Sequence, residues 1–73
     1  MGKRIFYMPT QTAAMRGRDV LTAMGIHAYV GRNTELHAGE GCGYTLTVQA
    51  NGERAEGILR QRRVPVTRKE DIG

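Results

Sequence analysis

The chain contains a single cysteine, Cys42, among its 73 residues, so no internal disulfide can stabilise its fold. A chain of this length forms one domain, whose apolar core yields only about 3–5 kcal/mol of net stability. A metal motif built on paired cysteines is excluded as well, and nothing indicates an oxidising compartment. The sequence therefore predicts a single domain over residues 1–73 that is held together by side-chain packing.

Two segments have the periodicity of amphipathic helices. Small and apolar residues recur at helical spacing over Ala13–Met24, just before Gly25, which favours a left-handed helix end. A second helix is expected from a cap at Asn51 through about Gln61. Thr10 or Thr12 is expected to cap the first helix.

Four short segments are typical of β-strands because they are rich in β-branched and aromatic residues or alternate apolar with polar positions. The predicted strands are Lys3–Met8, Ile26–Val30, Tyr44–Val48 and Val64–Thr67. Pro65 favours an edge position for the last of them. The charged residues 69–73 are expected to be frayed.

The order β-α-β-β-α-β predicts an α+β, ferredoxin-like fold, with a four-stranded antiparallel sheet and two helices on one face. In that topology the first two strands run the same way, and the third lies reversed between them. The turn into the first helix and the loop Asn33–Gly41 are therefore expected at the same end of the sheet.

Cys42 follows this loop and lies between Gly41 and Gly43, which leave a sulfur atom accessible. A helix N-terminus carries unpaired N–H groups and a partial positive charge, so a thiol beside it has its thiolate form favoured. Thr10 and Thr12 are expected to supply hydroxyl donors at this end. A thiolate is the nucleophile in attack on sulfane sulfur and in disulfide exchange. The alternative is that Cys42 packs into the core beneath the loop.

Further charges and bases are candidates for supporting roles. Arg62 and Arg63 are expected to return to the same end before the last strand and to add positive charge. His37 could act as a base for Cys42. A metal site that combines Cys42 and His37 with Glu35 or Glu40 matches no known spacing, so neither a metal nor a cofactor is expected.

The net charge of +4 favours anionic partners, but the basic residues are dispersed and the aromatic residues are few, which argues against nucleic acid. The apolar run after Met1–Arg4 ends at Met8 and Pro9, too short for a signal peptide or a membrane span. The sequence predicts a cytoplasmic protein without membrane contact.

Over nearly its whole length the chain resembles a family of short bacterial proteins described as selenium/sulfur carrier-like. The resemblance rests on four segments, namely Phe6-Tyr7, Thr12-Ala13-Ala14-Met15, Met24-Gly25-Ile26, and Gly41-Cys42-Gly43-Tyr44 followed by Leu46 and Val48. It implies that Cys42 is a carrier thiol. The chain departs from the family at Asn33-Thr34, where a proline-arginine pair is common, and at an inserted Gly39-Glu40.

Together these observations predict a carrier rather than an enzyme, in which Cys42 transiently holds sulfur or selenium as a persulfide or selenosulfide. Its expected partners are a donor and an acceptor protein. One alternative is a non-catalytic regulatory or interaction module that pairs its edge strands with a second copy or with another protein. A further alternative is a soft-metal delivery protein that uses Cys42 and His37.

Overall fold

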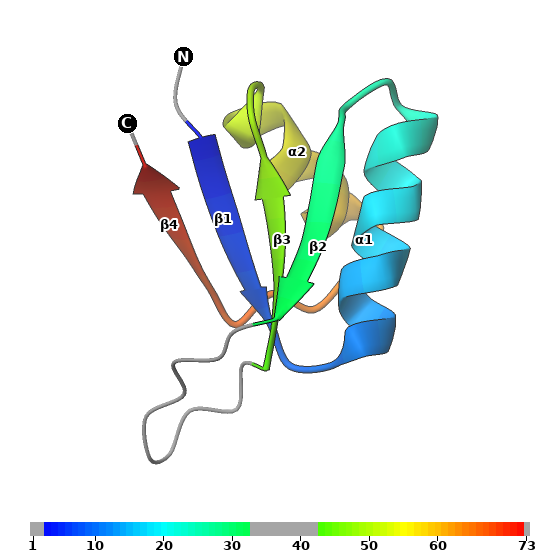
Figure 1. Ribbon diagram of the computed structural model, residues 1–73. Helices are drawn as coiled ribbons and strands as arrows, with labels where there is room; N and C mark the ends of the chain where they lie inside the picture. The colour runs from blue at the N-terminus through cyan, green and yellow to red at the C-terminus, as the bar shows by residue number, and fades with distance from the viewer. Residues whose placement is uncertain (1–2, 33–42, 73) are drawn as a thin grey trace.

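The computed structural model describes residues 3–32 and 43–72 and contains two helices and four strands in the predicted β-α-β-β-α-β order (Figure 1). The elements are β1 (Lys3–Met8), α1 (Gln11–Ala23), β2 (Ala28–Arg32), β3 (Tyr44–Val48), α2 (Gly52–Gln61) and β4 (Arg68–Ile72). None of the described helices is long and apolar enough to cross a membrane.

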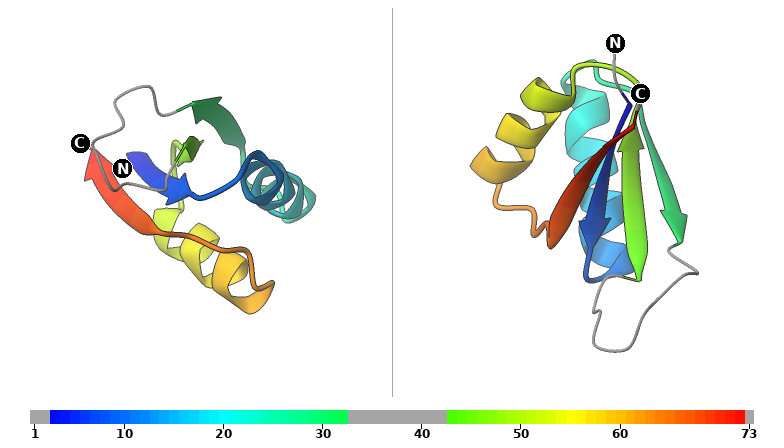
Figure 2. Two further views of the ribbon diagram at one scale, coloured as in Figure 1. Left: turned by 90° about the horizontal axis from the view of Figure 1, so that it is seen from below. Right: turned by 90° about the vertical axis from the view of Figure 1, so that its left-hand side faces the viewer.

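The four strands form one sheet in the order β2-β3-β1-β4, and every neighbouring pair is antiparallel. Leu46 of β3 lies opposite Phe6 of β1 on one side and Val30 of β2 on the other, which fixes the register of these three strands. Strands β1 and β2 therefore run in the same direction. Both helices lie on one face of the sheet (Figure 2), which confirms the ferredoxin-like α+β fold.

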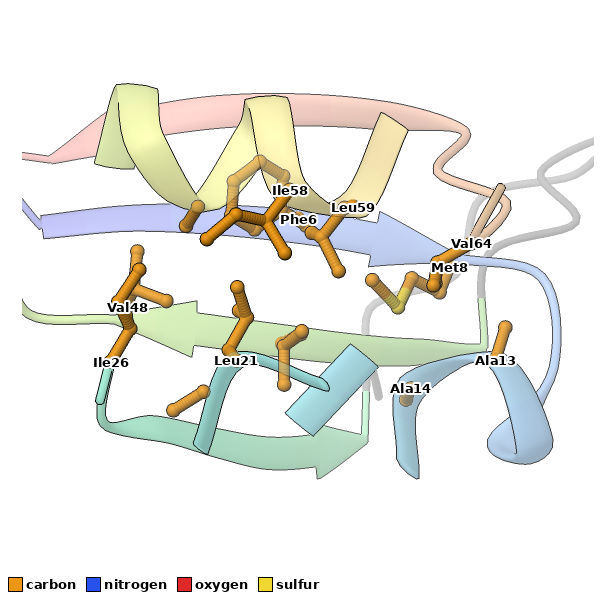
Figure 3. Close-up of a cluster of buried hydrophobic side chains, with 13 residues drawn as sticks. Phe6, Met8, Ala13, Ala14, Leu21, Ile26, Val48, Ile58, Leu59 and Val64 are labelled. Atoms are coloured by element: carbon orange, nitrogen blue, oxygen red, sulfur yellow. The ribbon is translucent and has the colours of Figure 1, made fainter. Parts of the chain in front are cut away.

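The core lies between the sheet and the two helices, where alternate strand residues meet the helix stripes (Figure 3). Its fully buried large side chains are Phe6, Met8, Leu21, Leu46, Val48 and Leu59. Helix α1 comes close to the sheet at Gly17, where an added Cβ atom would lie 2.8 Å from Cδ2 of Leu46. A side chain at this position would force the ends of the Leu46, Leu59 and Met8 side chains to shift, which favours glycine.

Helix α1 begins at the Thr10 cap, where the backbone N–H of Ala13 donates to Thr10 Oγ1 at 3.1 Å. Thr12, the other predicted cap, lies inside the first turn. At the other end Gly25 has a φ of 81°, and the N–H of Ile26 donates to the carbonyl of Leu21 at 2.8 Å. Ile26 was expected to open the second strand, but this hydrogen bond closes the helix, and β2 begins at Ala28.

Helix α2 follows Asn51, which occupies the predicted cap position but makes no side-chain cap hydrogen bond. Its backbone is left-handed, with a φ of 59°, a conformation that asparagine tolerates better than most residues. Arg63 takes the same φ of 59° after the last turn, where the N–H of Val64 donates to the carbonyl of Leu59 at 2.9 Å. An arginine thus fills a helix-end position that usually holds glycine.

The prediction for the last strand, Val64–Thr67, is wrong, because that strand is formed by Arg68–Ile72, among residues that were expected to be frayed. Val64 uses its N–H to close α2 and is buried in the core, and Pro65 has no N–H to give to a sheet. Pairing with β1 starts when the N–H of Thr67 donates to the carbonyl of Tyr7 at 2.7 Å, and it continues through β4.

Candidate functional site

The candidate site lies at the end of the sheet where β1 and β2 finish and β3 begins. Tyr44, the first residue of β3, pairs with Met8 on one side and with Arg32 on the other. Helix α1 starts at Gln11, directly after the turn that follows Met8 (Figure 1). The prediction that the start of α1 and the approach to β3 share one end of the sheet is confirmed for the described residues.

A shallow groove marks this end. It is lined by Gln11 of α1, Tyr44 of β3, and Val30, Gly31 and Arg32 of β2. The guanidinium carbon of Arg32 lies 5.9 Å from the centre of the Tyr44 ring, within cation–π range. The groove therefore joins the first residue of α1 to the first residue of β3.

Arg32 is a groove residue that the sequence did not single out. The predicted second strand ended at Val30, so Arg32 was assigned to neither a strand nor the site. The alternation that continues from Ala28 through Val30 to Arg32 is the signal that could have found it, because it keeps Arg32 on the helix side of the sheet.

Gly43 is the described residue nearest in sequence to Cys42. It is half-buried, and a Cβ atom added to it would have no described heavy atom within 4 Å. The space around Gly43 is therefore open on the described side. Cys42, Gly41 and His37 lie outside the described residues, so what the sequence predicts for them stays a prediction.

Both predicted threonines lie at this end, in different roles. Thr10 Oγ1 accepts the capping hydrogen bond from Ala13, whereas Thr12 lies exposed in the first helical turn. The first turn of α1 carries no acidic residue, so no local carboxylate offsets the partial positive charge of the helix N-terminus. This end of α1 is electrostatically suited to an anion.

Arg62 is not brought to the first turn of α1. It lines a second groove together with Asp19, Val20, Ala23 and Met24, in the C-terminal half of that helix. Asp19 lies about 12 Å along the helix from Gln11, given the rise per residue. Arg63 is exposed at the end of α2. The structure thus separates Arg62 from the two threonines with which it was grouped.

The lowered carboxyl pKa values of the described residues belong to an ion-pair network away from this groove. Lys69 donates to Glu56 at 2.6 Å and lowers the pKa of that carboxyl, and Arg4 lowers the pKa of Asp71 through a hydrogen bond. These groups join α2, β1 and β4, so their shifted pKa values reflect structure rather than chemistry at a site. The described residues contain no group of three or more side chains that could hold a metal ion.

No known protein family, curated protein or solved structure matches the chain. The support for a function therefore comes from its residues and their geometry.

Proposed function

We propose that the chain carries sulfur or selenium on Cys42, as a persulfide or selenosulfide, between a donor and an acceptor protein. The observation that carries this proposal is the position of the start of α1, at the same end of the sheet as Gly43 and the start of β3. Cys42 directly precedes Gly43 in the chain. The glycines on both sides of Cys42, Gly41 and Gly43, have no side chain to shield a sulfur atom, which supports the same role.

The proposed reaction is thiol–disulfide exchange with a persulfide. The Cys42 thiolate attacks the terminal sulfur of the donor's persulfide, the donor's S–S bond breaks, and the donor's thiolate leaves. The transferred sulfur atom keeps its proton and becomes the terminal atom of the Cys42 persulfide. Attack at selenium gives the selenosulfide in the same way. Neither transfer needs an external oxidant or reductant.

The environment of α1 favours the nucleophilic form of such a thiol. Its N-terminal N–H groups carry a partial positive charge, and no acidic residue of the first turn opposes it. A thiol beside that turn has a pKa below the ordinary value of about 8.5, so a larger fraction of it is in the thiolate form at neutral pH. No described heavy atom lies within 4 Å of a Cβ atom added to Gly43, which supports access for a partner next to Cys42 in the chain.

The test uses the fact that Cys42 is the single cysteine, so every thiol reaction of the chain reports on it. The protein is incubated with a cysteine desulfurase and cysteine and then analysed by intact mass spectrometry. We expect a gain of one sulfur atom that dithiothreitol removes. The Cys42→Ser variant, shown to be folded by circular dichroism, should gain nothing. A wild-type chain that gains no sulfur would overturn the proposal.

A second measurement tests the role of α1. The rate of Cys42 alkylation is measured against pH to obtain the thiol pKa. Gln11→Glu places a carboxylate in the first turn and should raise that pKa, because it offsets the helix charge. Thr22→Glu adds the same charge near the other end of α1 and should leave the thiol pKa unchanged. Equal pKa values in all three proteins would place the thiol away from the helix start.

A further inference from the structure

The face of the sheet opposite the helices is not covered by any described helix or strand (Figure 2). Its side chains come from alternate positions of all four strands and are called the open face below. The described side chains are Lys3, Ile5 and Tyr7 of β1, Tyr29 and Gly31 of β2, Thr45 and Thr47 of β3, and Arg68 and Glu70 of β4. By register the last residue of β4, Ile72, also falls on this face, opposite Lys3.

Two aromatic groups lie on the open face, each beside a second flat side chain. The Arg68 guanidinium carbon lies 4.0 Å from the centre of the Tyr7 ring. The rings of His27 and Tyr29 have centres 4.9 Å apart and are tilted by 38°. Tyr29 is 52% exposed, although it belongs to a strand of the sheet. Two of the three tyrosines of the chain thus lie on the open face.

The strand register places Tyr7 in β1 and Tyr29 in β2 at the two ends of a diagonal path that crosses β3. Tyr29 lies opposite Thr47, and Tyr7 lies opposite Thr45, the residue two positions earlier in the same strand. Two strand spacings and two residues separate the tyrosines, which is roughly 12 Å. The residues between them are threonines, which are small. The path can therefore be occupied by a flat, extended ligand.

The open face carries two basic residues, Lys3 and Arg68, and one acidic residue, Glu70, whereas the other charged residues of the described chain lie elsewhere. All eleven Lys and Arg residues are described, whereas Glu35 and Glu40 are not, which leaves five of the seven acidic residues. Four of these five lie on the helices or in the network on the helix side, and these are Asp19, Glu53, Glu56 and Asp71.

The remaining acid, Glu70, lies on the open face, where it is already engaged. Its carboxylate is 3.8 Å from the Arg68 guanidinium and accepts a hydrogen bond from the Tyr7 hydroxyl at 3.4 Å. Lys3 adds a second cation to the same strand as Tyr7. The open face thus combines aromatic rings with a small excess of positive charge.

From these observations we propose that the open face binds single-stranded nucleic acid, with bases stacked on Tyr7 and Tyr29 and phosphates near Lys3 and Arg68. Aromatic side chains on a sheet and nearby cations are what unpaired bases and phosphates require. The sequence argued against this partner because it has few aromatic residues. The fold gathers two tyrosines and a histidine on one surface, which a count of residues does not reveal.

A second copy of the chain is a poorer fit to the same surface. A stable interface buries about 800 Å² on each partner and has a largely apolar centre. Ile5 and, by register, Ile72 are the aliphatic residues of the open face, and they lie in different strands, each beside charged residues. Pairing two copies face to face would also bury Lys3, Arg68 and Glu70. In a complex with nucleic acid the two cations can pair with phosphates, whereas a dimer interface would have to remove all three charges from water.

The test uses tyrosine fluorescence, because the chain has three tyrosines and no tryptophan. The protein is titrated at low salt with oligouridylate and oligodeoxythymidylate of roughly ten nucleotides and with a duplex of equal length. We expect the single strands to quench the fluorescence and the duplex to bind more weakly. The two single-stranded probes distinguish RNA from DNA.

Three tyrosine variants provide matched comparisons, with affinities measured by the anisotropy of a labelled oligonucleotide. Tyr7→Leu and Tyr29→Leu should each weaken binding about ten-fold, because each removes one stacking partner. Tyr44→Leu removes a tyrosine from the helix side of the sheet and should leave the affinity unchanged. Lys3→Gln should make the salt dependence shallower by roughly 0.7 in logarithmic slope. Circular dichroism verifies that each variant is folded.

Several results would overturn the proposal. These are the absence of binding to the wild-type chain at low salt, equal losses in Tyr44→Leu and Tyr29→Leu, and equal affinity for single strands and duplex. A dimer in sedimentation that dissociates in Tyr29→Leu would assign the face to a second copy instead. Cys42→Ser should bind oligonucleotide normally, so this proposal and the carrier proposal can fail independently.

Discussion

Glu56 accepts a hydrogen bond from Lys69 at 2.6 Å, and this contact joins the middle of α2 to strand β4. Arg4 of β1 lies 3.1 Å from the same carboxylate and also donates to Asp71 of β4, while Arg60 approaches Glu56 to 2.9 Å. The helix-facing residues Lys69 and Asp71 of β4 are both charged. Ion pairs therefore link β4 to α2 where the other strands have apolar contacts.

The first prediction concerns acid. The hydrogen bond from Lys69 lowers the pKa of Glu56, and the one from Arg4 lowers the pKa of Asp71. A carboxyl whose pKa is lowered in the folded state stabilises that state at neutral pH, and the stabilisation is lost as the pH falls through the folded pKa. Below about pH 4 we expect the β4 amides to exchange with solvent faster than those of β3, as measured by hydrogen exchange.

A variant isolates the network at neutral pH. Glu56→Gln removes the shared carboxylate and should speed exchange in β4, an effect that added salt should reproduce in the wild-type chain. The gain in rate should be modest, because two of the partners of Glu56, Arg60 and Lys69, are exposed to solvent. Asp19→Asn removes an acid that pairs with Arg18 on α1 and should leave β4 unchanged. Equal exchange in all three proteins would mean that backbone pairing alone holds the strand.

The second prediction compares two helical glycines. Gly17→Ala should destabilise the chain by about 1–3 kcal/mol, because the new Cβ atom would lie 2.8 Å from Leu46 Cδ2 and 3.2 Å from Leu59 Cδ2. Gly57 lies in α2, and a Cβ atom added to it would have no described heavy atom outside the neighbouring helix backbone within 4 Å. Gly57→Ala should therefore stabilise the chain by about 0.5–1 kcal/mol. Urea unfolding of both variants measures the difference. A stabilised Gly17→Ala would contradict the close approach of α1 to the sheet.

These glycines show how far the sequence predicted the fold. Helical spacing placed Gly17 on the apolar stripe of α1, which is confirmed, because period and residue type are local properties. Met24, on the same predicted stripe, is 42% exposed, because the helix ends there and Gly25 turns the chain away. The C-terminal ends of both helices were predicted to within one residue, at Ala23 and at Gln61, but the spacing did not predict that the last residue of the stripe would be exposed.

The error at β4 has a different cause. Val64 and Val66 have strand-like composition, whereas β4 itself is a run of charged residues that ends in Ile72. Such a run forms a strand because partners distant in sequence neutralise it, and those partners come together only in the folded chain. The same limit applies to the site. The topology predicted which ends meet, but Arg32 and the separation of Arg62 from Thr10 depend on packing between distant segments.

The third prediction concerns Arg63, which holds a left-handed backbone with a φ of 59°. That conformation costs a residue with a Cβ atom about 1–2 kcal/mol, whereas glycine adopts it freely. Glycine also loses more entropy on folding, so Arg63→Gly should stabilise the chain by a net amount of about 0.5–1 kcal/mol. Thermal unfolding measures this change.

A comparison with the preceding residue separates backbone from side chain. Arg62→Gly changes a position with a φ of −88°, where glycine brings no relief, and should destabilise the chain slightly. If Arg63→Gly proves less stable than the wild type, the guanidinium of Arg63 makes contacts that outweigh its strained backbone.

The fourth prediction links the cap of α1 to the chemistry proposed for Cys42. Thr10→Ala removes the oxygen that accepts the Ala13 N–H and should cost about 1 kcal/mol of stability. Thr12→Ala changes an exposed residue inside the first turn and should be neutral or slightly stabilising, because alanine is the better helix former. Urea unfolding of the two variants tests the cap itself.

The same pair of variants tests whether the start of α1 acts on the thiol. Loss of the cap lets the first turn fray, so the N–H groups that favour an anion are held less firmly. The alkylation rate of Cys42 against pH should then report a higher thiol pKa in Thr10→Ala than in Thr12→Ala. If Thr10→Ala loses stability but its thiol pKa matches that of Thr12→Ala, the cap is purely structural and the charge that favours the thiolate must come from another part of the chain.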